Sequence, residues 1–415
     1  MRAFLRRAWP LVALAALAAI GVVAVAKQLR DGNDFPIYWQ AARDVIAGRS
    51  PYDVGTGLHG YVYLPWFALS MAPLALLPLG VAAWVWYLVN LAFIWYSGRT
   101  LLDALRMEGV PVRGWPPALA TLALVGLFHD NLVLGQANLF LLWLVSLGIR
   151  ASQRAGSPSH RGIPFGWAAA LKMPAAVLAL PLLMRRRFSV VLGLMLSVAL
   201  AAGLPLLESG GTGLRLLQDW RAKVIAPAAA GTLQGSKNID QSPQAALRRL
   251  LVAEPAFDDH AVNVASLDQA TFARVSRITS IVFLLGYVIV WLFAPRRASP
   301  RALLLDLALG CCAMVQLTGF SLKAQFVVLL LPAWLAASLA WDGPWRVRRV
   351  SLVVAGALFL LAQPGLVGRT VSDWMLAYSS MTVATVILAK VLAWQRLTLP
   401  PSDAPAAAPD PGTVR

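Results

Sequence analysis

Four aspartates occupy a polar stretch near the start of the chain, at about residues 28–60: Asp31, Asp34, Asp44 and Asp53. Tyr38 and Trp39 lie among them and are of the aromatic type that collects where lipid meets water. Partial desolvation at such a boundary raises the pKa of a carboxyl group and strengthens it as a base. These aspartates are therefore candidates for base chemistry, although a solvated loop carboxylate is the commoner case for any single one.

Basic side chains within or beside apolar stretches form a second set of candidates. Lys323 lies in an apolar block, where an ionisable residue is a functional candidate by default. A side chain that merely extends to the membrane surface is an equal alternative. Lys172 lies in the middle of another apolar block and would either pair internally or reach a cavity. Arg248 and Arg249 could serve an anion, or they could form the solvated face of a helix.

Other residue types that often carry chemistry form no soluble-enzyme motif. The chain has no phosphate-binding P-loop, no pair of CxxC motifs and no HExxH, and its four scattered histidines argue against a three-histidine metal site. Asp31 and Asp34 could share a divalent cation, but no complete ligand set is visible, so no metal site is assigned. Gln136 and Asn138 are interpreted as hydrogen-bonding residues between membrane helices.

The composition is that of a helical membrane protein. Of the 415 residues, 59% are hydrophobic and 13% are charged, whereas about a quarter are charged in a soluble domain. The apolar residues form blocks of about 17–22, long enough for a helix to cross a hydrocarbon core of about 30 Å. The net charge of +17 comes largely from arginines between these blocks, which indicates membrane orientation rather than binding of nucleic acid.

The apolar blocks predict an all-α polytopic membrane protein with about twelve spanning helices. The first helix is interpreted as retained rather than cleaved, so both termini and most arginine clusters lie in the cytoplasm. Two basic stretches, about 99–113 and 150–161, face outward in this arrangement, against the usual rule. Gln136 and Asn138 fall near the cytoplasmic end and receive no catalytic role. The predicted helices are 9–28, 61–78, 80–98, 116–130, 132–149, 163–183, 188–207, 277–294, 302–319, 321–341, 349–366 and 374–395.

Two large polar loops, about 28–60 and 208–274, are predicted on the outer side of a single domain that covers residues 1–397. In the first loop, the spacing of apolar residues predicts a helix over 34–46 that lies along the membrane surface. In the second loop, a helix over 243–251 is predicted, with Ser242 as its N-cap. The Pro/Ala-rich tail, 398–415, is predicted to be disordered and cytoplasmic.

Several short motifs, in order along the N-terminal half, resemble glycosyltransferase family 87. Their order and spacing make the combination specific, although each is weak alone. Two later segments depart from the family's pattern. A compact Asn-Gln-Ser run is spread over 238–242, and a Ser-Trp-x-His arrangement is replaced by Ser321-Leu322-Lys323-Ala324-Gln325. The matching motifs are Asp34-Phe35-x-x-Tyr38-Trp39-x-Ala41-Ala42, Gly48 with Pro51-Tyr52, Tyr61-x-Tyr63-x-Pro65 before Pro73 and Pro78, Gly135-Gln136-x-Asn138, and Gly166 before Lys172-x-Pro174.

The resemblance implies a GT-C-like enzyme of the plasma (inner) membrane whose active site faces away from the cytoplasm. Such an enzyme moves a hexose, mannose by the family's example, from polyprenyl phosphate to a lipid or glycan acceptor. It implies that Asp34 is the catalytic base and that the anomeric carbon is inverted. A phosphate leaving group needs cationic or hydrogen-bonding partners rather than an acid. Candidates for the donor's phosphate or sugar are Lys323, Gln325, Tyr38, Trp39, Arg248 and Lys172.

Other functions remain open from the sequence. A polytopic transporter or lipid flippase agrees with the number of helices, but the missing internal repeat and the large outer loops argue against it. A non-catalytic scaffold in envelope assembly would depend on no single carboxylate. A glycan ligase would move a whole oligosaccharide instead of one sugar.

Overall fold

The computed structural model describes residues 2–30, 33–53, 60–112, 114–154, 156, 158–207, 211–229, 237–294, 300–341 and 346–399. Every regular element within these ranges is a helix, and none of them contains a strand. The all-α prediction is therefore confirmed for the described part of the chain. Nearly all of the predicted disordered tail lies outside it.

Within the described ranges, five helical stretches are long and apolar enough to cross a membrane. A sixth is formed if α19 (Arg369–Ala377) and α20 (Ser380–Leu397), which bend by 59° at their junction, count as one span. By this measure the chain is a membrane protein, but the predicted number of twelve spans is not confirmed. The five are α5 (Leu79–Met107), α6 (Trp115–Leu134), α10 with η4 (Phe188–Leu207), α14 (Gln269–Phe293) and η7 with α16 (Lys323–Trp341).

Two helices predicted in the polar loops are confirmed. The first is α2 (Asp34–Ile46), and the second is α13 (Pro243–Leu251), where the Ser242 hydroxyl accepts the backbone N–H of Ala245 at 3.1 Å. The remaining helices are α1 (Arg2–Gln28), α3 (Pro65–Ser70), α4 (Ala72–Ala75), α7 (Asn138–Ser152), η2 (Ser159–Gly162), α8 (Ile163–Leu171), η3 (Met173–Leu178), α9 (Ala179–Met184), α11 (Thr212–Trp220), η6 (Arg221–Ile225), α12 (Ala226–Ala229), α15 (Pro300–Gln316), α17 (Arg346–Leu361) and α18 (Pro364–Val367).

One predicted span, 61–78, is wrong. This stretch forms α3 and α4, of six and four residues, which are too short to cross a membrane. Pro65 is the first residue of α3, Pro73 is the second residue of α4, and Pro78 is the N-cap of α5. Because proline lacks a backbone N–H, each of them interrupts the hydrogen bonding of one continuous helix.

The predicted span 163–183 is also wrong as a single helix. It breaks at Lys172, whose backbone is extended, and continues as η3 and α9. Lys172 reaches the ring of Tyr63, with Nζ 5.7 Å from the ring centroid. Arg187, just after α9, returns to the end of α7 and donates to the Ser152 carbonyl at 2.5 Å. The segment therefore enters and leaves at one end of the bundle, with Lys172 at its tip.

The helices have arginine-rich connections at one end, called the basic end from here on. Arg301, at the start of α15, donates to the Glu108 carbonyl at the end of α5 at 2.9 Å. Buried Asp306 accepts from Arg185 at 2.6 Å and from Arg396 at 2.8 Å. These contacts gather the connections α5–α6, α9–α10 and α14–α15 with the end of α20.

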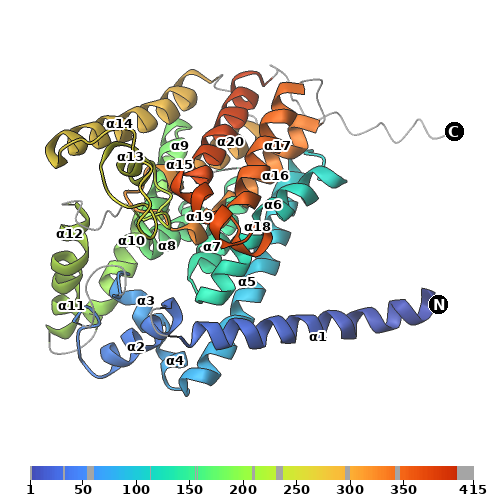
Figure 1. Cartoon of the computed structure of the whole chain (residues 1–415). Helices are drawn as coiled ribbons and strands as arrows, with labels where there is room; N and C mark the ends of the chain where they lie inside the picture. Colours follow the sequence, from blue (N-terminus) through green and yellow to red (C-terminus); the bar gives the residue numbers. More distant parts are fainter. Residues whose placement is uncertain are drawn as a thin grey trace.

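The opposite end, called the Asp34 end from here on, contains α2 and the turn between α6 and α7. Gln28, the last residue of α1, donates to the Leu132 carbonyl of α6 at 2.5 Å. Asn131 donates to the Ala324 carbonyl at 2.9 Å, which brings the start of η7 to the same end. Figure 1 shows α2, α3 and α4 clustered beside the end of α1. The twelve-helix arrangement placed the α6–α7 turn at the end of the bundle away from Asp34. The structure places it at the same end as Asp34, because the stretch 61–78 does not cross the membrane.

Candidate active site

Asp34 is the first residue of α2, a helix with one buried face. The N-terminal end of a helix favours a negative charge because its N–H groups are unpaired and its dipole is positive there. Asp34 itself is half-buried. The spacing of the buried residues is that of an amphipathic helix, which fixes where α2 and its first residue lie. Its buried apolar side chains are Phe35, Tyr38, Ala41, Ala42 and Val45.

Two side chains donate hydrogen bonds to the Asp34 carboxylate. The Gln136 Nε2 group donates to Oδ2 at 2.6 Å, and the Tyr38 hydroxyl, one turn along α2, lies 3.4 Å from Oδ1. The Tyr38 hydroxyl also pairs with the hydroxyl of Tyr63 at 2.9 Å. A carboxylate offers about four lone-pair sites, so these two donors leave space for a third donor such as an acceptor hydroxyl.

A chain of buried amides decides which way Gln136 points. Asn131 Nδ2 donates to two backbone carbonyls, including that of Ala324, so its oxygen faces Asn138. Asn138 Nδ2 then donates to Asn131 Oδ1 at 3.0 Å and to Gln136 Oε1 at 2.9 Å. Since the oxygen of Gln136 is engaged there, its NH₂ group faces Asp34. The predicted position of Gln136 and Asn138, at the end of the bundle away from Asp34, is therefore wrong.

Gly135 makes the turn that carries Gln136 to Asp34. It ends α6 with φ of +68°, a left-handed conformation that glycine adopts without steric cost. A Cβ atom at this position would lie 2.6 Å from the Phe35 Cβ, because α2 passes directly against the turn. The Gly135 carbonyl accepts a hydrogen bond from the Trp86 indole at 2.8 Å. Only glycine allows this close approach between the turn and α2.

The surroundings of Asp34 are of the kind that strengthens a carboxylate as a base. Burial raises the pKa of Asp34 above the ordinary value, while the positive charge of Lys172 and the hydrogen bonds from Gln136 and Tyr38 partly oppose this shift. A carboxylate with a raised pKa accepts a proton more readily at neutral pH. Tyr38 and Lys172, both predicted to bind the donor, are not among the residues that line the cavity beside Asp34.

Asp34 opens onto a cavity of about 460 Å³ at the Asp34 end. Residues from distant parts of the chain meet there, and carboxylates and cations occur in the same walls. Such an arrangement can accept a proton and hold an anion within one space. The charged residues that line it within the described ranges are Asp34, Asp130, Asp373, Lys237, Lys323 and Arg369.

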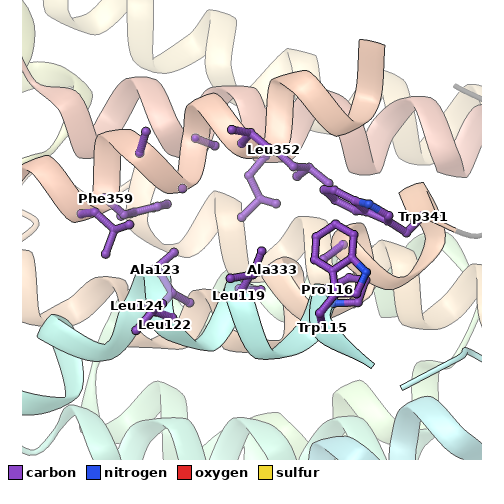
Figure 2. Close-up of a pocket in the computed structure, with 18 residues that line it drawn as sticks. Trp115, Pro116, Leu119, Leu122, Ala123, Leu124, Ala333, Trp341, Leu352 and Phe359 are labelled. Carbon is purple, nitrogen blue, oxygen red and sulfur yellow. The ribbon is translucent and has the colours of Figure 1, made fainter. Parts of the chain in front are cut away.

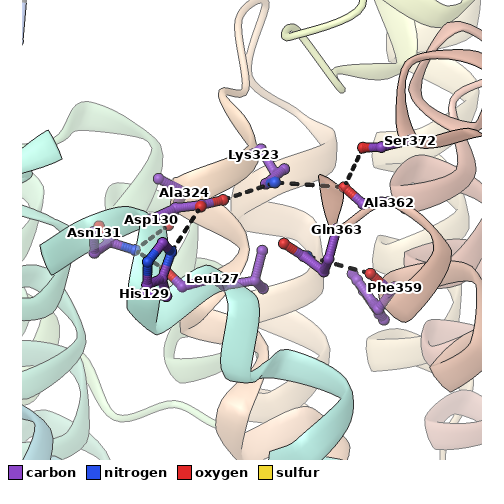
Figure 3. A network of polar contacts seen from close by, with 10 residues as sticks. All are labelled: Leu127, His129, Asp130, Asn131, Lys323, Ala324, Phe359, Ala362, Gln363 and Ser372. Atoms are coloured by element: carbon purple, nitrogen blue, oxygen red, sulfur yellow. Dashed lines mark hydrogen bonds and ion pairs between the residues drawn. The ribbon is translucent and has the colours of Figure 1, made fainter. Parts of the chain in front are cut away.

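Lys323, a predicted anion-binding residue, lies in the wall of this cavity. Its Nζ atom pairs with Asp130 Oδ2 at 2.8 Å and lies 3.4 Å from the Ala362 carbonyl (Figure 3). His129 Nδ1 lies 3.6 Å from the other oxygen of Asp130. Lys323 therefore connects η7 to the end of α6 and to the turn that follows α17.

Two cations of the cavity were missed by sequence reasoning. Lys237 and Arg369 are both exposed, and neither forms an ion pair within the described part of the chain. Arg369 begins α19, directly after Gly368. Nothing in the local sequence distinguishes either residue from an ordinary surface cation. They become candidates for the site only because the folded chain brings both to the cavity of Asp34.

The segment 238–242 holds the start of η7 beside the cavity. The buried carboxylate of Asp240 accepts the backbone N–H groups of Ser242 and Ser321, both at 2.9 Å. Gln241 donates its own N–H to the Ser321 carbonyl at 2.8 Å, and an isolated antiparallel bridge joins Asp240 to Leu322. This segment is the one in which the Asn-Gln-Ser run is spread out. Its contacts with the start of η7 help to bring Lys237 and Lys323 to one wall of the cavity.

Three other predicted donor-binding residues are not among those that line the cavity. The Trp39 indole donates to a backbone carbonyl just before α5, at 3.1 Å. Arg248 pairs with Glu254 at 2.5 Å beside α13. Gln325 follows Lys323 by two residues in η7. Asp31, considered as a cation ligand together with Asp34, lies outside the described residues.

An all-helical membrane chain with a half-buried carboxylate and cations around one cavity has the features of a membrane enzyme. The sequence model of glycosyltransferase family 87 matches residues 61–321, well over half of the chain. The chain belongs to glycosyltransferase family 87 and is a membrane glycosyltransferase. The matched range includes Gln136 and Lys172, whereas Asp34 precedes it and Lys323 follows it. No curated protein and no solved structure matches the chain.

Proposed function

We propose that this protein transfers a hexose, with mannose as the expected sugar, from polyprenyl phosphate to a hydroxyl group of an extracytoplasmic lipid or glycan. The observation that carries the proposal is that a carboxylate suited to act as a base and several cations line one cavity. Glycosyl transfer from a phosphate donor needs both kinds of group. Neither a transporter nor a scaffold requires them in this combination.

Asp34 is the base in this reaction. It takes the proton of the acceptor hydroxyl as the hydroxyl oxygen attacks the anomeric carbon and the bond to the phosphate oxygen breaks. A single displacement of this kind inverts the anomeric configuration. Gln136 and Tyr38 orient the carboxylate, because both donate to it from fixed positions. A positioned base of this kind contributes about 10²–10⁴-fold to the rate.

Lys323, Lys237 and Arg369 stabilise the leaving phosphate. Their charges offset the negative charge that develops on the phosphate as the glycosidic bond breaks, and hydrogen bonds between ions are stronger than neutral ones. Asp130 holds Lys323 in the cavity wall through its ion pair. Ammonium groups carry three donors, so Lys323 has donors for the phosphate while it keeps this pair.

The orientation of the chain follows from its charges. Arginine-rich connections gather at the basic end, which the positive-inside rule assigns to the cytoplasm. The last turns of α5, with Arg106, and of α7, with Arg150, which belong to the basic stretches 99–113 and 150–161, also lie at this end. The Asp34 end, with its cavity, then faces the outside. This orientation removes the two exceptions that the twelve-helix arrangement contained.

The proposal is tested by measuring sugar transfer from polyprenyl-phosphate mannose in membranes that contain Asp34→Asn. The control is Asp53→Asn, which changes an exposed aspartate of the same loop that does not line the cavity. We expect Asp34→Asn to lower kcat at least about 100-fold and the control to stay near the wild type. Full activity of Asp34→Asn at normal expression would contradict the role of Asp34. Flux of a lipid or solute through proteoliposomes without sugar transfer would favour a transporter instead.

A further inference from the structure

A second, apolar cavity of about 270 Å³ lies between α6 and α17, with α16 behind it (Figure 2). This cavity is called the α6–α17 groove from here on. Its walls are almost entirely hydrocarbon, and α17 contributes Gly356 and Phe359 while α6 contributes Ala123 and Leu124. The groove runs along the two helices. At the basic end, the indole rings of Trp115 and Trp341 lie edge to face, with centroids 4.7 Å apart.

The other end of the groove points to the cavity of Asp34. On α17, Phe359 lines the groove, and the carbonyl of Ala362, three residues later, lies 3.4 Å from Lys323 Nζ. Pro364, two residues beyond Ala362, lines the cavity of Asp34. On α6, the groove ends near Leu124, and Asp130, less than two turns later, lines that cavity. Helix α6 therefore lines both spaces in succession, and the segment that directly follows α17 leads from the groove to the cavity of Asp34.

One buried side chain, Gln363, occupies the junction between the two spaces (Figure 3). Its Nε2 group donates to the Phe359 carbonyl at 3.2 Å. Its side chain lies against Gly126 of α6, where any Cβ atom would collide with it. The junction is therefore closed by a side chain that packs against a glycine of α6, not by backbone atoms.

We propose that the α6–α17 groove binds the isoprenoid chain of the lipid donor, with the donor's phosphate beside Lys323. This inference rests on the proposed function. An apolar channel that leads to a cation matches the chemistry of a polyprenyl phosphate, whose hydrocarbon begins directly at the phosphate. Between Trp115 and Leu124 the helical rise gives the groove a length of about 13 Å, so it takes only the first part of a long chain. The remainder continues into the bilayer.

The test fills the groove with a side chain. In Gly356→Leu, the new Cβ atom lies 3.6 Å from the Ala123 Cβ, an ordinary contact, and the rest of the side chain occupies the groove. The matched control is Gly286→Leu in α14. Gly286 lines a different apolar pocket, between α14, α15 and α20, and a Cβ atom there meets nothing within 4 Å. Both variants replace a helical glycine by leucine in an apolar pocket.

The measurement compares kcat/KM for a long-chain polyprenyl-phosphate mannose with that for an analogue whose chain is a single isoprene unit, which is too short to fill the groove. We expect Gly356→Leu to reduce the preference for the long donor at least about tenfold, because burial of several methylene groups is lost. The preference should stay unchanged in Gly286→Leu. An unchanged preference in Gly356→Leu, together with an inactive Asp34→Asn, would overturn the groove proposal and leave the proposed function intact.

Labelling of the wild-type protein provides a readout that does not require activity. A polyprenyl phosphate that carries a photoreactive group on its second isoprene unit should label peptides of α6 or α17. A tenfold excess of unlabelled polyprenyl phosphate should abolish this labelling, and the same excess of phospholipid should not. Competition by phospholipid, or labelling confined to other helices, would show a general lipid contact and overturn the proposal. If the enzyme transfers no sugar from polyprenyl phosphate, the proposed function fails. The labelling would still show whether the groove binds the isoprenoid chain.

Discussion

Gln136 Nε2 lies 2.6 Å from Asp34 Oδ2, although the two residues are 102 positions apart in the chain. The contact exists because Gly135 turns the end of α6 directly against α2. It connects the α6–α7 turn, which the family match includes, to an aspartate that precedes the match. The following predictions test this connection and the groups around it.

Replacement of Gln136 by leucine should lower activity, because Asp34 loses a donor that orients its carboxylate and keeps it ionised. The hydrogen bond from Gln136 stabilises the ionised carboxylate, so its loss raises the pKa of Asp34 further. A hydrogen bond to a charged group contributes about 1.5–3 kcal/mol, so kcat at neutral pH should fall by at least about tenfold. The measurement is kcat as a function of pH in detergent-solubilised enzyme. Gln395→Leu, which changes a buried glutamine far from the cavity, serves as the control; equal losses in both variants would point to a folding defect.

Lys172→Met should shift the pH dependence without removing the base. The positive charge of Lys172 lowers the pKa of Asp34, so its removal raises that pKa. Asp34 must be ionised to accept a proton, and therefore the acid limb of the kcat profile should move to higher pH. Lys172→Arg keeps the charge and should keep the limb near its original position. If Lys172→Met lost activity equally at all pH values, Lys172 would act by holding the break between α8 and η3 in place rather than through its charge.

Gly135→Ala should lower both stability and activity. Alanine in the left-handed conformation costs about 1 kcal/mol, and contact with Phe35 adds to this cost. The melting temperature in detergent should fall, and kcat should fall with it because the turn moves Gln136 away from Asp34. Gly80→Ala is the matched control, since a Cβ atom at Gly80 meets nothing within 4 Å. A Gly135→Ala protein with unchanged melting temperature and kcat would refute the close approach.

The cations of the cavity should govern the use of the donor. In Lys323→Gln and Arg369→Gln, loss of one hydrogen bond between ions should lower kcat/KM for the lipid donor by at least about tenfold each. Arg248→Gln should leave this value close to the wild type, because Arg248 pairs with Glu254 outside the cavity. Initial rates at varied donor concentration give the comparison. An effect of Arg248→Gln as large as that of the other two would argue against this cavity as the phosphate site.

Local patterns were sufficient for the class of fold and for parts of the loops. Apolar blocks predict membrane helices because a backbone in lipid must pair its own polar groups. The helix over 34–46 and the N-cap at Ser242 follow from side-chain spacing and from a hydroxyl acceptor beside free N–H groups, both of which act within a few residues. The family resemblance also rests on short motifs, and the match over residues 61–321 confirms it.

The tertiary structure decided which hydrophobic stretches cross the bundle and which residues meet Asp34. The stretch 61–78 is apolar enough for a span, yet its prolines divide it, and this reverses the predicted direction of α6 relative to α2. Gln136, Lys237 and Arg369 reach the cavity through packing between segments far apart in sequence. Hydrophobicity is a property of a local segment, whereas a catalytic geometry depends on long-range contacts. For that reason composition determined that the chain forms membrane helices, and only the packed chain determined which stretches span the bundle and which groups surround the carboxylate.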